Sequence, residues 1–312
     1  MGTSAGTLDS PDADAKIRCS DRSRAAALSP IGTAGTQDGF VLVEMPLPWP
    51  RDVGRTPEGV ALAPLLAPRR HRLQAVVPAD PAAPPQERGV ILHSRPPGPG
   101  FNGYRRLRGR VGASLTATVA ALLEAAADPA PSEFDAPGVD VLVCTHGTRD
   151  SCCGRRGAAL AVRAADVPGA EVRRTSHLGG HRFAPTFLVL PQGTAWGYAD
   201  PELVTKVVRR EVPFGEVAEH YRGCTGLDGP QVQALELEVL RKVGWSLLDV
   251  PRTGTFDGTW ADLSWREDGQ TVIWAADVRA GRAVPMPRCM EPATPDGGSE
   301  TEWDVTAVYR CQ

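Results

Sequence analysis

Apolar segments of this chain follow one order twice. In each half, a strand and a helix are followed by three short strands and a second helix, with Pro- and Gly-rich segments between them. The first half has predicted segments at 40–45, 57–66, 72–77, 89–94, 103–109 and 114–127. The second half has them at 139–144, 154–165, 170–176, 186–191, 194–199 and 201–212. Both halves are therefore predicted to be α/β units of the order β-α-β-β-β-α.

This order resembles a thioredoxin-like unit, and its repetition favours a duplication, with coincidence as the alternative. We expect an N-terminal thioredoxin-like half without ligands at 18–130 and a second such unit, which holds the candidate ligands, at 137–213. Residues 1–17 are polar and are predicted to be disordered. A helical stripe followed by Trp-containing strands predicts a small α+β C-terminal subdomain at 227–312.

Length and composition limit the class of protein. A chain of 312 residues is too long for one ordinary core, and a net charge of −3 gives no electrostatic footprint for nucleic acid. No apolar run reaches the roughly 18 to 20 residues of a membrane helix, and the N-terminal residues lack the apolar region of a secretory signal. Seven cysteines, an odd number, argue against a disulfide framework. We therefore expect a cytoplasmic protein with reduced thiols and no membrane partner.

Two cysteines and two histidines of the second half have the arrangement of metal ligands. Cys144 ends the first predicted strand, where open α/β sheets present functional loops, and Cys153 begins the next helix, where backbone N–H groups stabilise a thiolate. His177 and His181 follow the second strand, with two glycines between them that suit a tight loop. Four such ligands can hold a tetrahedral Zn²⁺ or a [2Fe–2S] cluster.

The segment CTHGTRDSCCGRRG, followed by SHLGGHRFAPTFLVLPQGTAWGYAD, resembles the sucrase/ferredoxin-like family. This family is a branch of the thioredoxin-like [2Fe–2S] ferredoxins. The resemblance extends upstream through CSDRSRAAALSPIGTA and FVLVEMPLPWP and covers most of residues 19–212. It implies a [2Fe–2S] cluster with the ligands Cys144, Cys153, His177 and His181. A sucrase activity is not supported, because no pair of carboxylates has a recognisable glycosidase setting.

Side chains next to these four leave alternatives open. Cys152 adjoins Cys153 and could compete as a ligand, but in the family pattern the cysteine before Gly154 is the ligand. Cys152 is then expected to be a buried small side chain. His146 either hydrogen-bonds the cluster or a ligand, or packs within its loop. Arg149 and Asp150 are expected to pair and fix that loop.

Other charged and thiol side chains are assigned more ordinary roles. Three arginines flank the site and either steer an acidic redox partner or are solvated: Arg155, Arg156 and Arg182. Four cysteines have no partner at ligand spacing and are expected to be structural or incidental: Cys19, Cys224, Cys289 and Cys311.

The ligand set predicts a one-electron carrier. Replacing two thiolates by neutral imidazoles raises the reduction potential above that of an all-cysteine ferredoxin, and a second imidazole nitrogen that reaches solvent makes the potential pH-dependent. The partners are then redox donor and acceptor proteins whose identity is unknown. Three alternatives remain: a structural Cys2His2 zinc protein, a thiol–disulfide oxidoreductase that uses Cys152 or Cys153, and a binding protein whose site has lost its metal.

Overall fold

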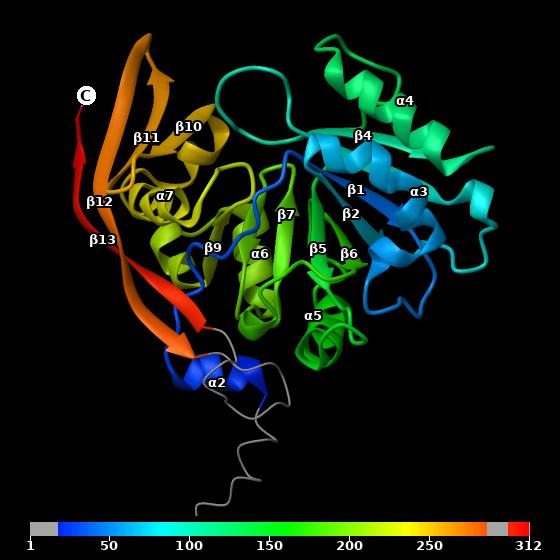
Figure 1. Ribbon diagram of the computed structural model, residues 1–312, viewed down its shortest axis with the longest axis horizontal. Coiled ribbons are helices and arrows are strands. Elements are labelled where there is room, and N and C mark those ends of the chain that lie inside the picture. Colours follow the sequence, from blue (N-terminus) through cyan, green and yellow to red (C-terminus); the bar gives the residue numbers. More distant parts are fainter. Residues whose placement is uncertain (1–17, 286–298, 312) are drawn as a thin grey trace, which may run out of the picture.

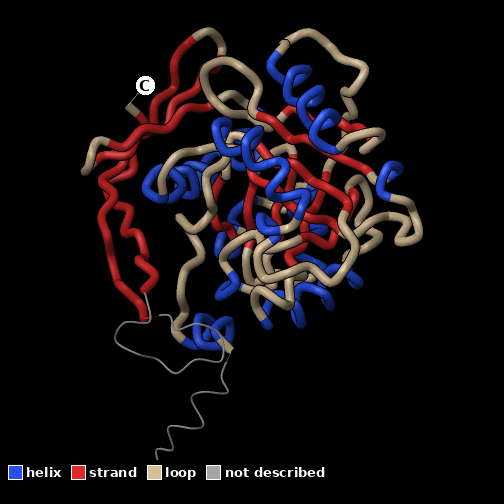
Figure 2. The backbone as a smooth tube through the Cα atoms, turned by 45° about the vertical axis from the view of Figure 1, so that its right-hand side comes forward, coloured by secondary structure: helices blue, strands red, loops and turns tan. Residues whose placement is uncertain are grey.

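The protein is a mixed α/β protein with two sheets. The computed structural model describes residues 18–285 and 299–311, so the predicted disorder at 1–17 and the thiol of Cys289 lie outside the described residues. A nine-stranded mixed sheet forms the centre, and a separate four-stranded antiparallel sheet lies beside it (Figures 1 and 2). None of the described helices has the length and apolarity needed to cross a bilayer.

The first half has the predicted order of elements. They are β1 (Gly39–Glu44), α3 (Pro57–Leu66), β2 (His71–Val76), β3 (Gly89–Ser94), β4 (Arg105–Arg110) and α4 (Leu115–Ala127). Strand β1 pairs in parallel with β2 and antiparallel with β3, and β3 pairs antiparallel with β4. Both helices begin at a hydroxyl cap, since Thr56 accepts a hydrogen bond from the N–H of Gly59 at 3.1 Å and Ser114 from that of Ala117 at 3.4 Å.

The second half repeats this order and these pairings. Its elements are β5 (Asp140–Cys144), α5 (Ala158–Arg163), β6 (Glu171–Thr175), β7 (Phe187–Leu190), β8 (Thr194–Trp196) and α6 (Pro201–Arg209). The helix predicted at 154–165 begins as a π-helical turn at Cys153–Gly157. Two elements are shorter than predicted, because Tyr198 and Arg210 adopt left-handed backbone conformations that neither a strand nor a helix can continue through.

The two halves share one sheet, with the order β4-β3-β1-β2-β6-β5-β7-β8-β9. Strands β2 and β6 join them antiparallel, and the pairing Val76–Thr175 is the single residue pair recorded for this joint within the described chain. Strand β9 (Tyr221–Cys224), which was not predicted, extends the far edge beside β8. Each half thus contributes its second strand to the joint.

The sheet curves so that the two halves also meet face to face. Along β1, Phe40 and Leu42 belong to the core of the second half, whereas Val41 and Val43 belong to a separate core under α3 and α4. At the inner face, the buried Asp140 of β5 contacts side chains of β3 and β4. Since three strands separate β3 from β5 in the sheet, this contact requires strong curvature.

The C-terminal part forms a helix and the second sheet. They comprise α7 (Pro230–Val243), β10 (Arg252–Phe256), β11 (Trp260–Glu267), β12 (Gln270–Pro285) and β13 (Ser299–Arg310). Val232, Leu235 and Val239 of α7 lie in one core with residues of β11 and β12.

A short helix that was not predicted, α2 (Cys19–Ala25), lies beside the ends of β12 and β13 (Figure 1). The guanidinium of Arg282 in β12 donates to the carbonyl of Ala26 at 3.0 Å. Helix α2 has seven residues and a polar sequence, so no apolar periodicity marks it. It brings Cys19 to the candidate site.

Candidate metal centre

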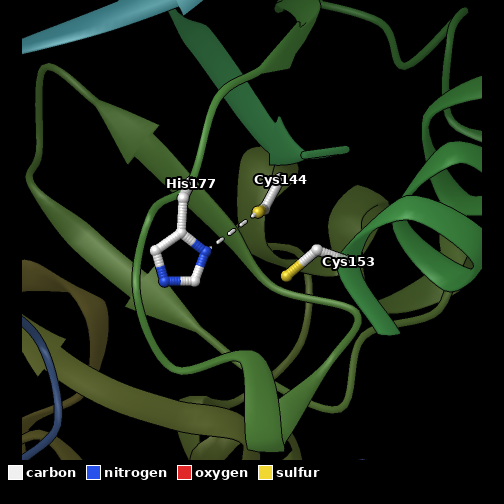
Figure 3. A group of neighbouring side chains, drawn as sticks. All are labelled: Cys144, Cys153 and His177. Atoms are coloured by element: carbon white, nitrogen blue, oxygen red, sulfur yellow. Dashed lines mark hydrogen bonds between the residues drawn. The ribbon is translucent and has the colours of Figure 1, made fainter. Parts of the chain in front are cut away.

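Three of the predicted ligands converge on one point. The sulfurs of Cys144 and Cys153 and a ring nitrogen of His177 all lie within 4.8 Å of one another. Their side chains point toward one another from the end of β5, the first turn of the following helix and the loop after β6 (Figure 3). The Sγ of Cys144 is 4.0 Å from the Nδ1 of His177, and both cysteines are fully buried.

Two glycines allow the helix that carries Cys153 to approach the end of β5. A Cβ atom on Gly157 would lie 1.8 Å from the carbonyl oxygen of Cys144, and one on Gly154 would lie 2.5 Å from the Cα of Gly147. Only a residue without a side chain fits at such distances. The turn at Cys153–Gly157 is π-helical, a local geometry often found at functional sites.

The pKa values of the two thiols, Cys144 and Cys153, are shifted in opposite directions. A hydrogen bond from Cys153 lowers the pKa of the Cys144 thiol well below its usual value, against the opposing effect of burial, and His177 acts in the same direction as Cys153. The same hydrogen bond raises the pKa of Cys153. One thiolate therefore forms readily in this pair, and a bound metal cation would favour ionisation of the second thiol.

The backbone of His177 is held by His146, which is itself anchored to the first half of the chain, and by Arg72 of that half. The Nδ1 of His146 accepts its N–H at 3.1 Å, and the Nε2 of His146 contacts the carbonyl of Pro50 at 2.8 Å, which fixes the neutral ring with its proton on Nε2. Burial lowers the pKa of His146 and favours this neutral form. Arg72 of β2 donates to the carbonyl of His177. His146 thus contacts the backbone of a predicted ligand.

His181 lies beside this group but has other partners. Its Nδ1 is 3.0 Å from a carboxylate oxygen of Asp150 and 3.2 Å from the Sγ of Cys19, and its ring centroid is 6.0 Å from that of His177. Burial would raise the pKa of Asp150, but hydrogen bonds from His181 and from backbone N–H groups hold it below its usual value. The predicted pairing of Arg149 with Asp150 is wrong, because Asp150 pairs with His181 and Arg149 turns toward the carbonyl of Arg51 at 3.5 Å.

Cys19 is the functional candidate that the sequence did not assign. Its Sγ is 3.6 Å from that of Cys152, and these two sulfurs and a carboxylate oxygen of Asp150 form a second group within 4.8 Å that could hold a metal ion. Cys152 is fully buried, as predicted. The contact joins residues 133 positions apart, so no spacing reveals it. The one signal in the sequence was the expected resemblance of the segment that begins at Cys19 to the family of the other ligand segments.

A comparison with protein families gives one match. Residues 30–223, more than half of the chain, match the model of the family described as sucrase/ferredoxin-like. The chain belongs to the sucrase/ferredoxin-like family. No curated protein and no solved structure matches it. The match includes all four predicted ligands of this sucrase/ferredoxin-like chain and ends before α7 and the C-terminal sheet.

A buried arginine supports the glycine loop of this sucrase/ferredoxin-like site. Arg222 of β9 is 2% exposed and donates to the hydroxyl and carbonyl of Thr33 at 3.0 and 2.6 Å and to the carbonyl of Gly179 at 3.3 Å. A Cβ on Gly180 would lie 2.4 Å from its guanidinium. Burial lowers the pKa of Arg222 to about 10, and the nearby Cys144 and Cys153 act in the opposite direction. Within the described residues, the recorded hydrogen-bond acceptors of Arg222 are one hydroxyl and two carbonyl oxygens, and none is a carboxylate.

The arginines that flank the site have different partners. Arg156 pairs with Asp21 of α2, and Arg182 pairs with Glu300 of β13, so these two hold the surroundings of the site together. A pocket of about 380 Å³ has His177 in its lining. Its lining includes Arg51, Arg72, Arg149, Asp52, His71 and His146. The sucrase/ferredoxin-like site therefore meets the surface through a largely basic pocket.

Proposed function

We propose that this protein holds a [2Fe–2S] cluster with the ligands Cys144, Cys153, His177 and His181 and transfers single electrons between a donor and an acceptor protein. The observation that carries the proposal is the convergence of two buried sulfurs and an imidazole within 4.8 Å. Membership of the sucrase/ferredoxin-like family supports it. Soft thiolates together with borderline imidazoles are the donors that iron–sulfur clusters use.

The surroundings of His181 suit a ligand role. Metal-binding histidines usually donate their other ring N–H to a carboxylate, which fixes the tautomer and the ring. Asp150, 3.0 Å from the Nδ1 of His181, is such a carboxylate, and it leaves Nε2 as the nitrogen for a metal. Asp150 also accepts the N–H of Cys152 at 2.8 Å, so one carboxylate orients both the His181 ring and the segment that carries Cys153.

When bound, the cluster would supply one-electron oxidation and reduction. The chain's own residues would affect the reduction potential of the cluster through their charges. Two imidazoles in place of two thiolates remove negative charge, which raises the potential above that of an all-cysteine ferredoxin. The buried Arg222 lies close enough to Cys144 and Cys153 to interact with both, and Arg72 with Cys144. These positive charges favour the reduced state further.

We also propose that both halves are thioredoxin-like and arose by duplication. The two halves have the same order of elements and the same pattern of one parallel and two antiparallel strand pairings. The corresponding domains are 18–130 and 137–213, followed by the C-terminal unit at 227–312. All four proposed ligands then belong to the second thioredoxin-like unit.

Zinc is the second candidate for this site. Three donors within 4.8 Å also suit a tetrahedral ion, and a Cys2His2 zinc site would be colourless and redox-silent. A thiol–disulfide enzyme based on Cys153 is less favoured, because the sulfurs of Cys153 and Cys144 are fully buried and out of reach of a disulfide in another protein. Metal identity therefore distinguishes the two leading functions.

The test is spectroscopy of anaerobically purified protein, combined with iron, sulfide and zinc analysis. We expect a red-brown protein with an EPR signal after dithionite reduction. His177→Cys and His181→Cys should each keep the cluster and lower its potential. The matched control is His71→Cys, since His71 lines the same pocket but hydrogen-bonds Ser94 and the carbonyl of Arg69. A colourless protein with stoichiometric zinc would contradict electron transfer.

A further inference from the structure

We propose that Cys19 and Cys152 form a second redox centre, a buried dithiol that oxidises reversibly to a disulfide. The two sulfurs are 3.6 Å apart although the residues are 133 positions apart in the sequence. One sulfur comes from the first residue of α2 and the other from the residue before the π-helical turn. Within the described residues, the other close pair of thiols is Cys144 and Cys153, which are assigned to the cluster.

The geometry favours formation of the bond. A disulfide has an S–S distance of about 2.05 Å, so the sulfurs, now 3.6 Å apart, need to approach by only roughly 1.6 Å. Cys19 is 1% exposed and Cys152 is fully buried, in a small cluster with Ala184. Burial excludes large thiol compounds, so the natural oxidant is a small neutral molecule and the bond forms within the chain.

The polar surroundings hold the two sulfurs in place. The hydroxyl of Ser20 donates to the Sγ of Cys152 at 3.4 Å, and the Nδ1 of His181 lies 3.2 Å from the Sγ of Cys19. The ion pair between Arg156 and Asp21 ties α2 to the helix that follows Cys152. The two segments that carry the cysteines are thus held together by an ion pair that does not involve the sulfurs.

Hydrogen peroxide can supply the oxidation of the two thiols, and the reaction then balances in atoms and electrons. The sulfur of one cysteine attacks hydrogen peroxide, the O–O bond breaks, and a sulfenic acid and one water form. The sulfur of the second cysteine then attacks the sulfenic sulfur, the S–O bond breaks, and the disulfide and a second water form. The thiols lose two electrons in total and the peroxide gains them. An external dithiol reverses the reaction by thiol–disulfide exchange once the region opens.

The Cys19–Cys152 pair would make the surroundings of the proposed cluster depend on the level of oxidants in the cell. Cys152 adjoins Cys153, and the Sγ of Cys19 contacts the ring of His181. Closing the disulfide would change that contact and join α2 covalently to the ligand segment. This consequence rests on the proposed function, whereas formation of the disulfide does not.

The experiment maps disulfides in the full chain by peptide mass spectrometry. The protein is treated with hydrogen peroxide, alkylated and digested, with a second sample returned to a dithiol before alkylation. We expect one cross-linked peptide that contains Cys19 and Cys152, lost in Cys19→Ser and in Cys152→Ser and restored to two alkylated thiols by the dithiol. Cys224→Ser is the matched control, since Cys224 is also buried but lies on β9 against the carbonyl of Gln192. Circular dichroism checks that each variant folds.

Two results would overturn the proposal. One is recovery of Cys19 and Cys152 as separate free thiols or sulfinic acids after peroxide treatment. The other is stoichiometric zinc that is lost in Cys19→Ser and Asp150→Asn but kept in Cys144→Ser, which would assign a metal ion to the pair. Repeating the disulfide map in Cys144→Ser separates the two proposals, because the cross-link should form there even when the cluster is absent.

Discussion

The Nδ1 of His146 accepts a hydrogen bond from the backbone N–H of His177 at 3.1 Å. His146 itself is anchored to the carbonyl of Pro50 and lies edge-on to Trp49. His146→Phe keeps an aromatic ring against Trp49 but removes the acceptor. We expect about a tenfold loss of metal affinity, as for other outer-shell changes, measured by competition with a chelator. His71→Phe serves as the control, and an equal loss in both variants would contradict the role of His146.

Asp150→Asn tests the carboxylate that holds His181. Asparagine keeps an oxygen that can accept the N–H of Cys152 but removes the charge that pairs with the imidazole. We expect a loss of metal affinity on the order of 10- to 100-fold, with little change in melting temperature. Thermal denaturation followed beside the affinity measurement separates the two effects. A large fall in melting temperature with unchanged affinity would show that Asp150 acts on the fold.

Gly157→Ala tests the close approach of the ligand helix to β5. Its Cβ would lie 1.8 Å from the carbonyl oxygen of Cys144, so the helix has to move away and take Cys153 with it. We expect loss of bound metal and a free energy of unfolding lower by about 3 kcal/mol, the upper range for overpacking. Gly215→Ala is the control, because nothing lies within 4 Å of its Cβ position. A metal-loaded Gly157→Ala protein would contradict the packing described.

Asp140 makes stability depend on pH. Burial would raise its pKa, but hydrogen bonds from His93 at 2.8 Å and from Arg106 at 2.6 Å hold the pKa well below the usual value. A carboxyl with a lower pKa in the folded state stabilises the fold above its unfolded pKa of about 4 and loses this effect as pH falls further. Burial also lowers the pKa of His93, so stability falls earlier, as pH drops through about 6.5.

Asp140→Asn should therefore be destabilised by about 3 to 5 kcal/mol near neutral pH, because it removes the charge that pairs with the buried Arg106. The difference from the natural chain should shrink as pH falls below about 4, where the aspartate of the unfolded chain takes up a proton that the folded chain does not. Denaturant unfolding at several pH values measures this. Asp257→Asn is the control, because Asp257 is exposed and hydrogen-bonds local backbone groups. A difference that stays constant with pH would contradict the assignment.

Local chemistry explains what the sequence could predict. The helix at 57–66 has its predicted bounds because Thr56 caps it and Pro57 suits its first turn. Cys144 and His177 meet because both follow strands that pair in parallel, β5 and β6, and so leave the sheet at the same edge. These features depend on short-range patterns.

Long-range contacts account for the features that the sequence could not predict. Cys19 reaches Cys152 across 133 residues, and His93 reaches Asp140 across a curved sheet. Apolar periodicity fixes which face of a strand is buried, but not which distant strand covers it. Strand β9 was missed because it has four residues, one of them a glycine and another the buried Arg222.

The pairing of β2 with β6 limits how short a fragment of this chain could hold the site. A fragment beginning at residue 137 would keep all four proposed ligands. It would lack Arg72, the Pro50 carbonyl that anchors His146, and Gln74, which accepts the hydroxyl of Ser176 at 2.9 Å. The first half therefore shapes the loop that carries His177, and a fragment without that half would keep the proposed donors but lose the contacts that position them.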